Sequence, residues 1–140
     1  MNSMCQVCGK GVISPTHPNQ KYCSLECGVI GKSRDKYQYY LSNQNEFCYD
    51  RNMKFIKPHI LLEQNNLCKI CCNLDIWNGK RIIFILDHID GNAINNLREN
   101  LRLICPNCDS QLDTFKSKNK NSSRKERYIR NYKNNNGSIS

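Results

Sequence analysis

The stretch LDHIDGNAINNLRENLRLICPNCDSQ, Leu86 to Gln111, decides the fold of this chain. It opens at the end of an apolar run with an acid and a histidine, Asp87 and His88, and continues through a Gly-Asn turn. It closes with a Cys-x-x-Cys pair that a second acid, Asp109, follows directly. Candidate metal ligands, a candidate base and half of a zinc site therefore lie within one short segment.

The hydrophobic pattern around this stretch predicts two strands and a helix. Residues 81–86, RIIFIL, are apolar without alternation, which is typical of a buried strand. Residues 90–92, Asp-Gly-Asn, indicate a turn, and residues 101–104 can return as the second strand. A helix is expected to start near Pro106, because proline suits the first helical position.

Residues 67–120 resemble the HNH endonuclease family, whose zinc-stapled members end in a run much like CPNC-[HD]-S-Q. The resemblance implies a ββα-metal fold that hydrolyses DNA. It implies that Asp87 and Asp109 bind one Mg²⁺ or Mn²⁺ and that His88 is the general base. It also implies that Asn100 ties the hairpin loop through its amide and holds the base in place. The last family position is often His or Asn, and Asp109 keeps an oxygen ligand there for a hard cation.

Ordinary structural roles remain open for some of these residues. Asp109 stands in the first turn of the expected helix, where an acid complements the helix dipole. Asp87 and His88 could simply end a strand. Two basic residues beside the second strand, Arg98 and Arg102, are candidates for gripping the phosphates of a nucleic acid, with Glu99 as a competing partner for one of them.

The chain has ten cysteines, and their spacing predicts two structural zinc sites. In a reducing compartment, cysteines two or three residues apart bind zinc more often than they oxidise. The first predicted set is Cys5, Cys8, Cys23 and Cys27, and the second is Cys68, Cys71, Cys105 and Cys108. Cys48 and Cys72 are left as spare thiols.

The first cysteine set predicts a small treble-clef or ribbon-like finger. Ser24 is expected to be the N-cap of a helix that runs to Leu41, and Gly28 and Gly31 lower the helix propensity of this segment. Residues 32–40 combine three basic side chains with three tyrosines, a composition that suits contact with nucleic acid. Packing of the helix explains the tyrosines equally well.

The fold class expected for the whole chain is α+β, small and zinc-stabilised, because 39% hydrophobic residues in 140 provide a limited core. We expect a four-cysteine finger and its helix at 1–41, a linker at 42–57, the HNH ββα-metal module at 58–118 and a basic, flexible tail at 119–140. Pro58 suits the start of a helix at the beginning of that module.

Positive charge is concentrated at the C-terminal end of a chain whose net charge is +9. Beyond Phe115 the sequence has a single acid, Glu126. The basic residues there are Lys116, Lys118, Lys120, Arg124, Lys125, Arg127, Arg130 and Lys133. Such a segment is attracted to phosphate backbones and binds them in a salt-dependent way. A solvated tail that keeps the protein soluble is the alternative.

No signal peptide precedes Cys5, and no apolar run approaches the ~20 residues that span a bilayer, so a cytoplasmic protein without a membrane partner is expected. The expected partner is double-stranded DNA, and a palindromic target would call for a homodimer. Homing, restriction and phage packaging are equally compatible settings. Two other functions stay open: a zinc-finger DNA-binding protein without catalysis, and an RNA-directed nuclease or toxin.

Overall fold

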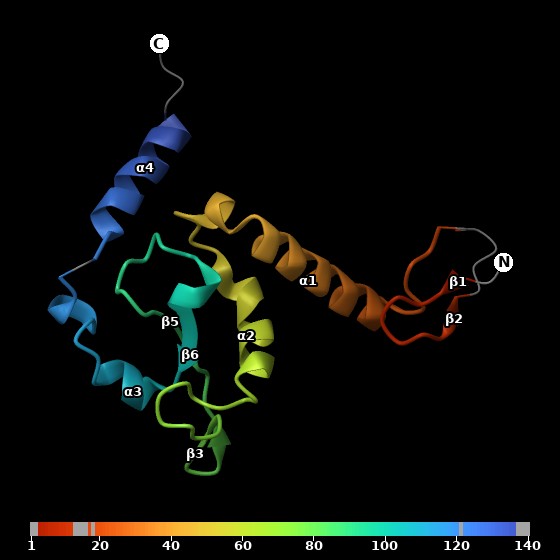
Figure 1. Cartoon of the computed structure of the whole chain (residues 1–140), viewed down its shortest axis with the longest axis horizontal. Coiled ribbons are helices and arrows are strands. Elements are labelled where there is room, and N and C mark those ends of the chain that lie inside the picture. The colour runs from red at the N-terminus through yellow and green to blue at the C-terminus, as the bar shows by residue number, and fades with distance from the viewer. Residues whose placement is uncertain (1–2, 13–16, 18, 121, 137–140) are drawn as a thin grey trace. The chain divides into compact units, whose positions relative to one another are not determined.

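The structure, a computed structural model, describes residues 3–12, 17, 19–120 and 122–136 of the 140-residue chain. The chain divides into two compact units, Met1–Ser42 and Asn43–Ser140. Both contain short strands and helices (Figure 1). None of the helices in the described ranges combines the length and the apolar character that crossing a membrane requires.

The first unit consists of a two-stranded ribbon and one long helix. β1 (Ser3–Met4) pairs antiparallel with β2 (Gly11–Val12). α1 spans Leu25–Ser42. It begins where the sequence predicts, because the Oγ of Ser24 accepts a hydrogen bond from the backbone N–H of Cys27 at 3.2 Å. The N-cap prediction is therefore confirmed.

Glycine in α1 makes room for an aromatic ring. A Cβ at Gly31 would lie 2.2 Å from Cε1 of Tyr22, so any other residue would displace that ring. Further along the helix Tyr37 and Tyr40 are buried, and their rings stack with centroids 5.9 Å apart. Packing therefore accounts for these two tyrosines, whereas Tyr39 is 53% exposed.

The core of the second unit surrounds an antiparallel pair of strands. β5 (Ile85–His88) pairs with β6 (Leu101–Ile104), with Asp87 opposite Arg102. α2 (Lys57–Glu63) packs on β6, and α3 (Pro106–Ser110) packs on β5 (Figure 1). The predicted second strand and the predicted helix start at Pro106 are confirmed. The buried apolar side chains of this core include Ile56, Ile60, Phe84, Leu101, Leu103 and Ile104.

A glutamine fastens the end of α2 to β6. The Nε2 of Gln64 donates to the Leu103 carbonyl, and its Oε1 accepts from the Leu103 N–H, both at 2.9 Å. Asn65 and Asn66 follow with φ of 54° and 59°, a left-handed conformation that asparagine tolerates better than most residues. The helix therefore ends immediately before them, and the chain turns toward the second cysteine set.

The single strand predicted over residues 81–86 is wrong. β4 (Lys80–Arg81) pairs with β3 (Ile76–Trp77) in a separate hairpin, and β5 starts only after the intervening residues. Between them Ile83 is 80% exposed whereas Phe84 is 4% exposed. An apolar run without alternation does not specify which side chains face the core, and here the chain changes its pairing partner within the run.

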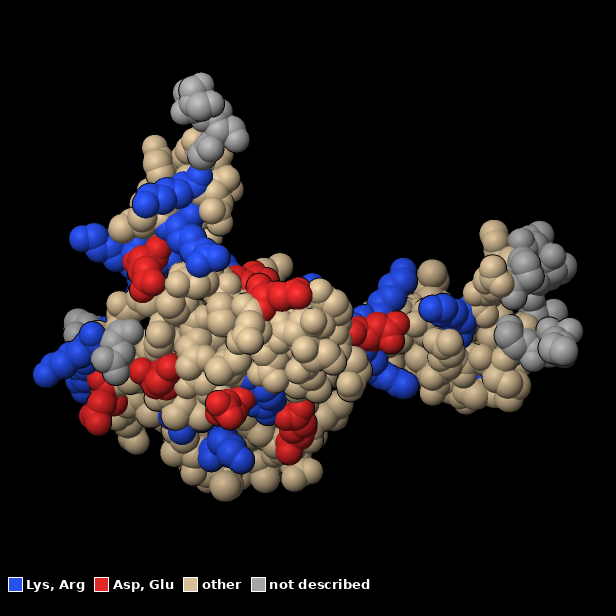
Figure 2. Space-filling view, turned by 45° about the horizontal axis from the view of Figure 1, so that its top comes forward, with Lys and Arg blue, Asp and Glu red and all other residues tan. Residues whose placement is uncertain are grey.

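Two segments outside the expected nuclease module are structured. Residues 43–57, where a linker is expected, belong to the second unit and include 3₁₀ turns at Gln44–Phe47 and Met53–Ile56. Another 3₁₀ turn, Lys116–Lys118, follows α3. In the expected tail, α4 spans Arg124–Asn136. Figure 2 shows lysine and arginine side chains gathered along it.

Candidate functional site

The sulfur atoms of each predicted cysteine set lie within 4.8 Å of one another. The Sγ atoms of Cys8 and Cys23 are 3.4 Å apart, and those of Cys71 and Cys105 are 3.8 Å apart. Four thiolates around a tetrahedral Zn²⁺ at ~2.3 Å would be about 3.8 Å apart, whereas a disulfide requires ~2.05 Å. Both sets therefore have donor atoms and spacings that fit Zn²⁺.

The surroundings of the second set favour a bound cation. Burial raises the pKa of Cys68, but hydrogen bonds from the backbone N–H groups of Cys71 and Cys105 outweigh it, and the pKa falls to about 6. Burial and then the neighbouring thiols raise the pKa of Cys108 to about 12. Each thiolate thus opposes ionisation of the next, and a central cation would remove that opposition. Among the described residues Cys72 stays outside the set, as predicted.

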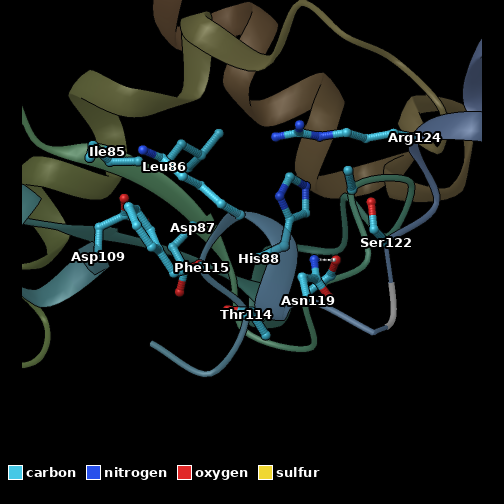
Figure 3. Close-up of a pocket in the computed structure, with 13 residues that line it drawn as sticks. Ile85, Leu86, Asp87, His88, Asp109, Thr114, Phe115, Asn119, Ser122 and Arg124 are labelled. Atoms are coloured by element: carbon cyan, nitrogen blue, oxygen red, sulfur yellow. Dashed lines mark hydrogen bonds between the residues drawn. The ribbon is translucent and has the colours of Figure 1, made fainter. Parts of the chain in front are cut away.

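Asp87, His88 and Asp109 line one pocket of the second unit (Figure 3). Its volume is about 360 Å³. The C-terminal end of β5 carries Asp87 and His88, and the short helix α3 carries Asp109. The three side chains do not form a compact ligand group of the kind that the cysteines form. The pocket therefore gathers two carboxylates and one imidazole from β5 and α3 without forming a ready-made three-ligand cluster.

Besides burial, the negative charge of Asp87 affects the pKa of Asp109, the other carboxylate of the pocket. Burial raises the pKa of Asp109, the charge of Asp87 raises it further, and Lys116 lowers it. Asp87 is 9% exposed, and its Oδ2 accepts a hydrogen bond from Nε of Arg102 at 2.7 Å. Its Oδ1 has no hydrogen bond within the described ranges. Carboxylate oxygens are the donor type that suits a hard divalent cation such as Mg²⁺ or Mn²⁺.

The arginines expected to reach phosphates are both held by other groups. Arg98 forms an ion pair with Glu63, and its NH1 donates to the Leu101 carbonyl at 2.6 Å. Arg102 is the partner of Asp87 across the strand pair. The competing partner of Arg98 is therefore Glu63 of α2 and not the adjacent Glu99.

Asn100 closes the loop that follows β5. Its Nδ2 donates to Oδ1 of Asp90 and to the Asn95 carbonyl, both at 2.9 Å, and its Oδ1 accepts from the Asp90 N–H at 3.0 Å. Within the loop Gly91 has φ of 72°, and a Cβ there would lie 2.8 Å from Cγ2 of Thr114. The asparagine amide and the glycine together fix the backbone directly after His88.

Asn96 contacts His88, although no sequence motif marks this asparagine. Its Oδ1 lies 2.8 Å from Nε2 of His88, and its Nδ2 donates to the carbonyls of Phe47 at 2.7 Å and Asp50 at 3.0 Å. Because both amide hydrogens are used, Oδ1 faces the ring and Nε2 must carry the proton, which leaves Nδ1 of the neutral imidazole as an acceptor. Asn96 is completely buried, but its position in an Asn-rich loop is the only sequence signal.

One curated protein matches part of this chain. It is the H-N-H endonuclease F-TflIV of Escherichia phage T5, which is 46% identical over 48 residues. The aligned segment covers 34% of this chain and 21% of that protein, so the chain spans about a fifth of the length of the relative it matches. No family profile matches the chain. No solved structure matches it either.

Proposed function

We propose that the second unit is a metal-dependent DNA endonuclease of the HNH type, in which β5, β6 and α3 form a ββα-metal fold. The observation that carries the proposal is the pocket that brings Asp87 and His88 of one strand together with Asp109 of the following helix. The 46% identity over 48 residues with a protein named H-N-H endonuclease supports it. The two cysteine sets would hold structural Zn²⁺, and the basic character of α4 suits a nucleic acid partner.

The protein groups divide the work of phosphodiester hydrolysis between them. Nδ1 of His88 takes a proton from water as the water oxygen bonds to phosphorus and the bond from phosphorus to the 3′ oxygen breaks. Asp87 and Asp109 would hold one Mg²⁺ or Mn²⁺, which when bound polarises the phosphate and stabilises the departing oxygen. Asn96 keeps the proton on Nε2, and Asn100 fixes the loop that directly follows His88.

A cleavage assay with zinc-loaded protein tests this function. Large natural DNA, a DNA duplex and an RNA duplex of the same sequence are incubated with and without Mg²⁺. We expect cleavage of DNA that requires Mg²⁺ or Mn²⁺. Binding of DNA without cleavage under any condition would support the zinc-finger alternative, and cleavage of RNA alone would support the RNA-directed one.

Asn96 offers a test of the proton position on His88. Asn96→Leu removes both the acceptor and the donors, whereas Asn96→Asp keeps an acceptor toward Nε2, loses the donors and adds a negative charge, so the spectra are compared at a pH where the ring is neutral. We expect ¹⁵N spectra of the histidine ring to show the Nε2-H form in the parent and in Asn96→Asp, and a mixture in Asn96→Leu. Cleavage by Asn96→Leu should fall by about 10- to 100-fold, the range for groups that orient a functional side chain. An unchanged tautomer in Asn96→Leu would contradict this role.

Asp109→Asn tests the proposed metal site. The pKa of Asp109 is raised by burial and by Asp87. Its stabilising contribution is therefore present at low pH and is lost as the pH rises through its folded-state pKa. At neutral pH without Mg²⁺ the variant should melt slightly higher than the parent. It should also require on the order of ten-fold more Mg²⁺ for half-maximal cleavage, because one charged ligand is lost. Equal Mg²⁺ requirements would argue against Asp109 as a ligand.

A further inference from the structure

The pocket that holds the two carboxylates also contains basic side chains. Lys116 and Arg124 line the same cavity as Asp87 and Asp109. In Figure 3, Asp109 and Arg124 enter the pocket from opposite ends. The hydrolytic steps described above use the acidic groups and the imidazole and give no role to these cations.

The first turn of α4 concentrates positive charge. Arg124 and Arg127 are three positions apart on the helix, so they are neighbours whose like charges repel. Within the described part of the chain neither arginine forms an ion pair. Burial lowers the pKa of Arg127, and the nearby charges of Arg51 and Arg124 lower it further. A bound anion would offset this repulsion.

Polar atoms at this turn are buried without partners. The NH1 of Arg127 donates to the carbonyl of Ala93, a residue of the pocket lining, at 3.3 Å. Its Nε has no partner among the described residues, and neither has the Oγ of Ser123, which is 8% exposed and precedes the helix. Buried polar atoms without partners are rare and need an explanation, such as an absent ligand.

Contacts further along α4 hold this turn in place. The guanidinium of Arg130 lies 3.9 Å from the ring centroid of Tyr49, and the Tyr49 hydroxyl donates to Oε1 of Glu126 at 3.3 Å. Tyr49 is adjacent to Asp50, whose carbonyl accepts from Asn96. The cations at the start of α4 are thus presented by a helix that is docked beside the catalytic pocket.

We propose that Arg124 and Arg127 form a phosphate-binding subsite, which holds a backbone phosphate of DNA next to the bond that is cut. The subsite rests on the proposed nuclease function and defines where the substrate strand runs. A phosphodiester fits because its oxygen atoms accept charge-assisted hydrogen bonds from guanidinium groups. The scissile phosphate at the acidic end and its neighbour at the basic end would then belong to one strand crossing the pocket.

Salt-dependent DNA binding without added Mg²⁺ tests the subsite independently of cleavage. Binding of a short labelled DNA duplex is measured by fluorescence anisotropy at several salt concentrations for Arg124→Ala and Arg127→Ala. Lys133→Ala is the matched control, because it removes the same charge from the last turn of the same helix. Loss of one phosphate contact should reduce the slope of log affinity against log salt by about 0.9, or about eight-fold in affinity at ~0.1 M salt. The control should keep the parental slope.

Each other outcome has a defined meaning. Equal slope losses in Arg124→Ala and Lys133→Ala would overturn the subsite and leave α4 as a uniformly basic arm. A parental slope in Arg124→Ala would overturn it as well. If Arg127→Ala melts at a lower temperature than the parent, the salt slope of Arg124→Ala alone tests the subsite. The Arg124 side chain is exposed and makes no described hydrogen bond, so its removal should leave the fold intact. A slope loss seen with an RNA duplex and not with DNA would overturn the DNA assignment.

Discussion

His88→Ala is expected to reduce DNA cleavage by about 10²- to 10⁴-fold, the range for removal of a general base. The pocket contains no other imidazole, and the contact to Asn96 leaves Nδ1 of His88 as its proton acceptor. The measurement is the single-turnover rate of cleavage with saturating Mg²⁺. Substrate binding should change little, because the loss concerns only the chemical step.

A matched control separates this effect from damage to the fold. His59→Ala removes an imidazole from α2, which lies outside the pocket lining, and should cut DNA at the parental rate. Both variants should retain two Zn²⁺. His88→Ala should melt somewhat lower than the parent, because the buried Oδ1 of Asn96 loses its hydrogen bond to the ring, so cleavage is compared well below both melting temperatures. If His88→Ala cleaves as fast as His59→Ala, the base has been assigned to the wrong residue.

Cys105→Ser is expected to unfold the second unit or to lower its melting temperature drastically. Cys105 belongs to the second cysteine set and precedes α3, where its Sγ accepts a hydrogen bond from the Cys108 N–H at 3.4 Å. Ligation of structural zinc contributes about 10–16 kcal/mol in finger peptides, which equals or exceeds the ~5–15 kcal/mol that stabilises a typical domain. Bound zinc should fall from two ions to one per chain, measured by elemental analysis alongside a thermal melt.

Cys72→Ser is the control for this experiment. Cys72 is adjacent to Cys71 and both are exposed, but only Cys71 belongs to the second set. We expect the variant to bind two Zn²⁺ and to have the same melting temperature as the parent protein. If Cys72→Ser loses one Zn²⁺ and a Cys71→Ser variant keeps both, then Cys72 and not Cys71 is the zinc ligand.

Much of the candidate site could be predicted from the sequence, because the patterns that mark it involve residues close together in the chain. The short spacing of the cysteine pairs, two or three residues apart, predicted which sulfur atoms come together in both cysteine sets. Pro106 marked the start of α3, and the return strand at residues 101–104 was correct. Each of these features depends on residues a few positions apart.

The features that could not be predicted depend on segments far apart in the chain. Asn96 acquires its role from carbonyls at residues 47 and 50, in a segment where only a linker was expected. Arg98 pairs with Glu63 of α2 rather than with its sequence neighbour Glu99. The break within the apolar run 81–86 likewise follows from pairing with strands on either side.

The sequence by itself determined the two four-cysteine sets, the acid and histidine at a strand end, and the helix that supplies the second acid, because spacing and turn chemistry act locally. Tertiary structure decided which nitrogen of His88 accepts a proton and which oxygen of Asp87 is bonded to Arg102. It also decided that a basic helix docks beside the pocket. The physical reason is that a buried side chain forms hydrogen bonds and ion pairs with the groups that packing places next to it. These groups often come from segments far away in the sequence.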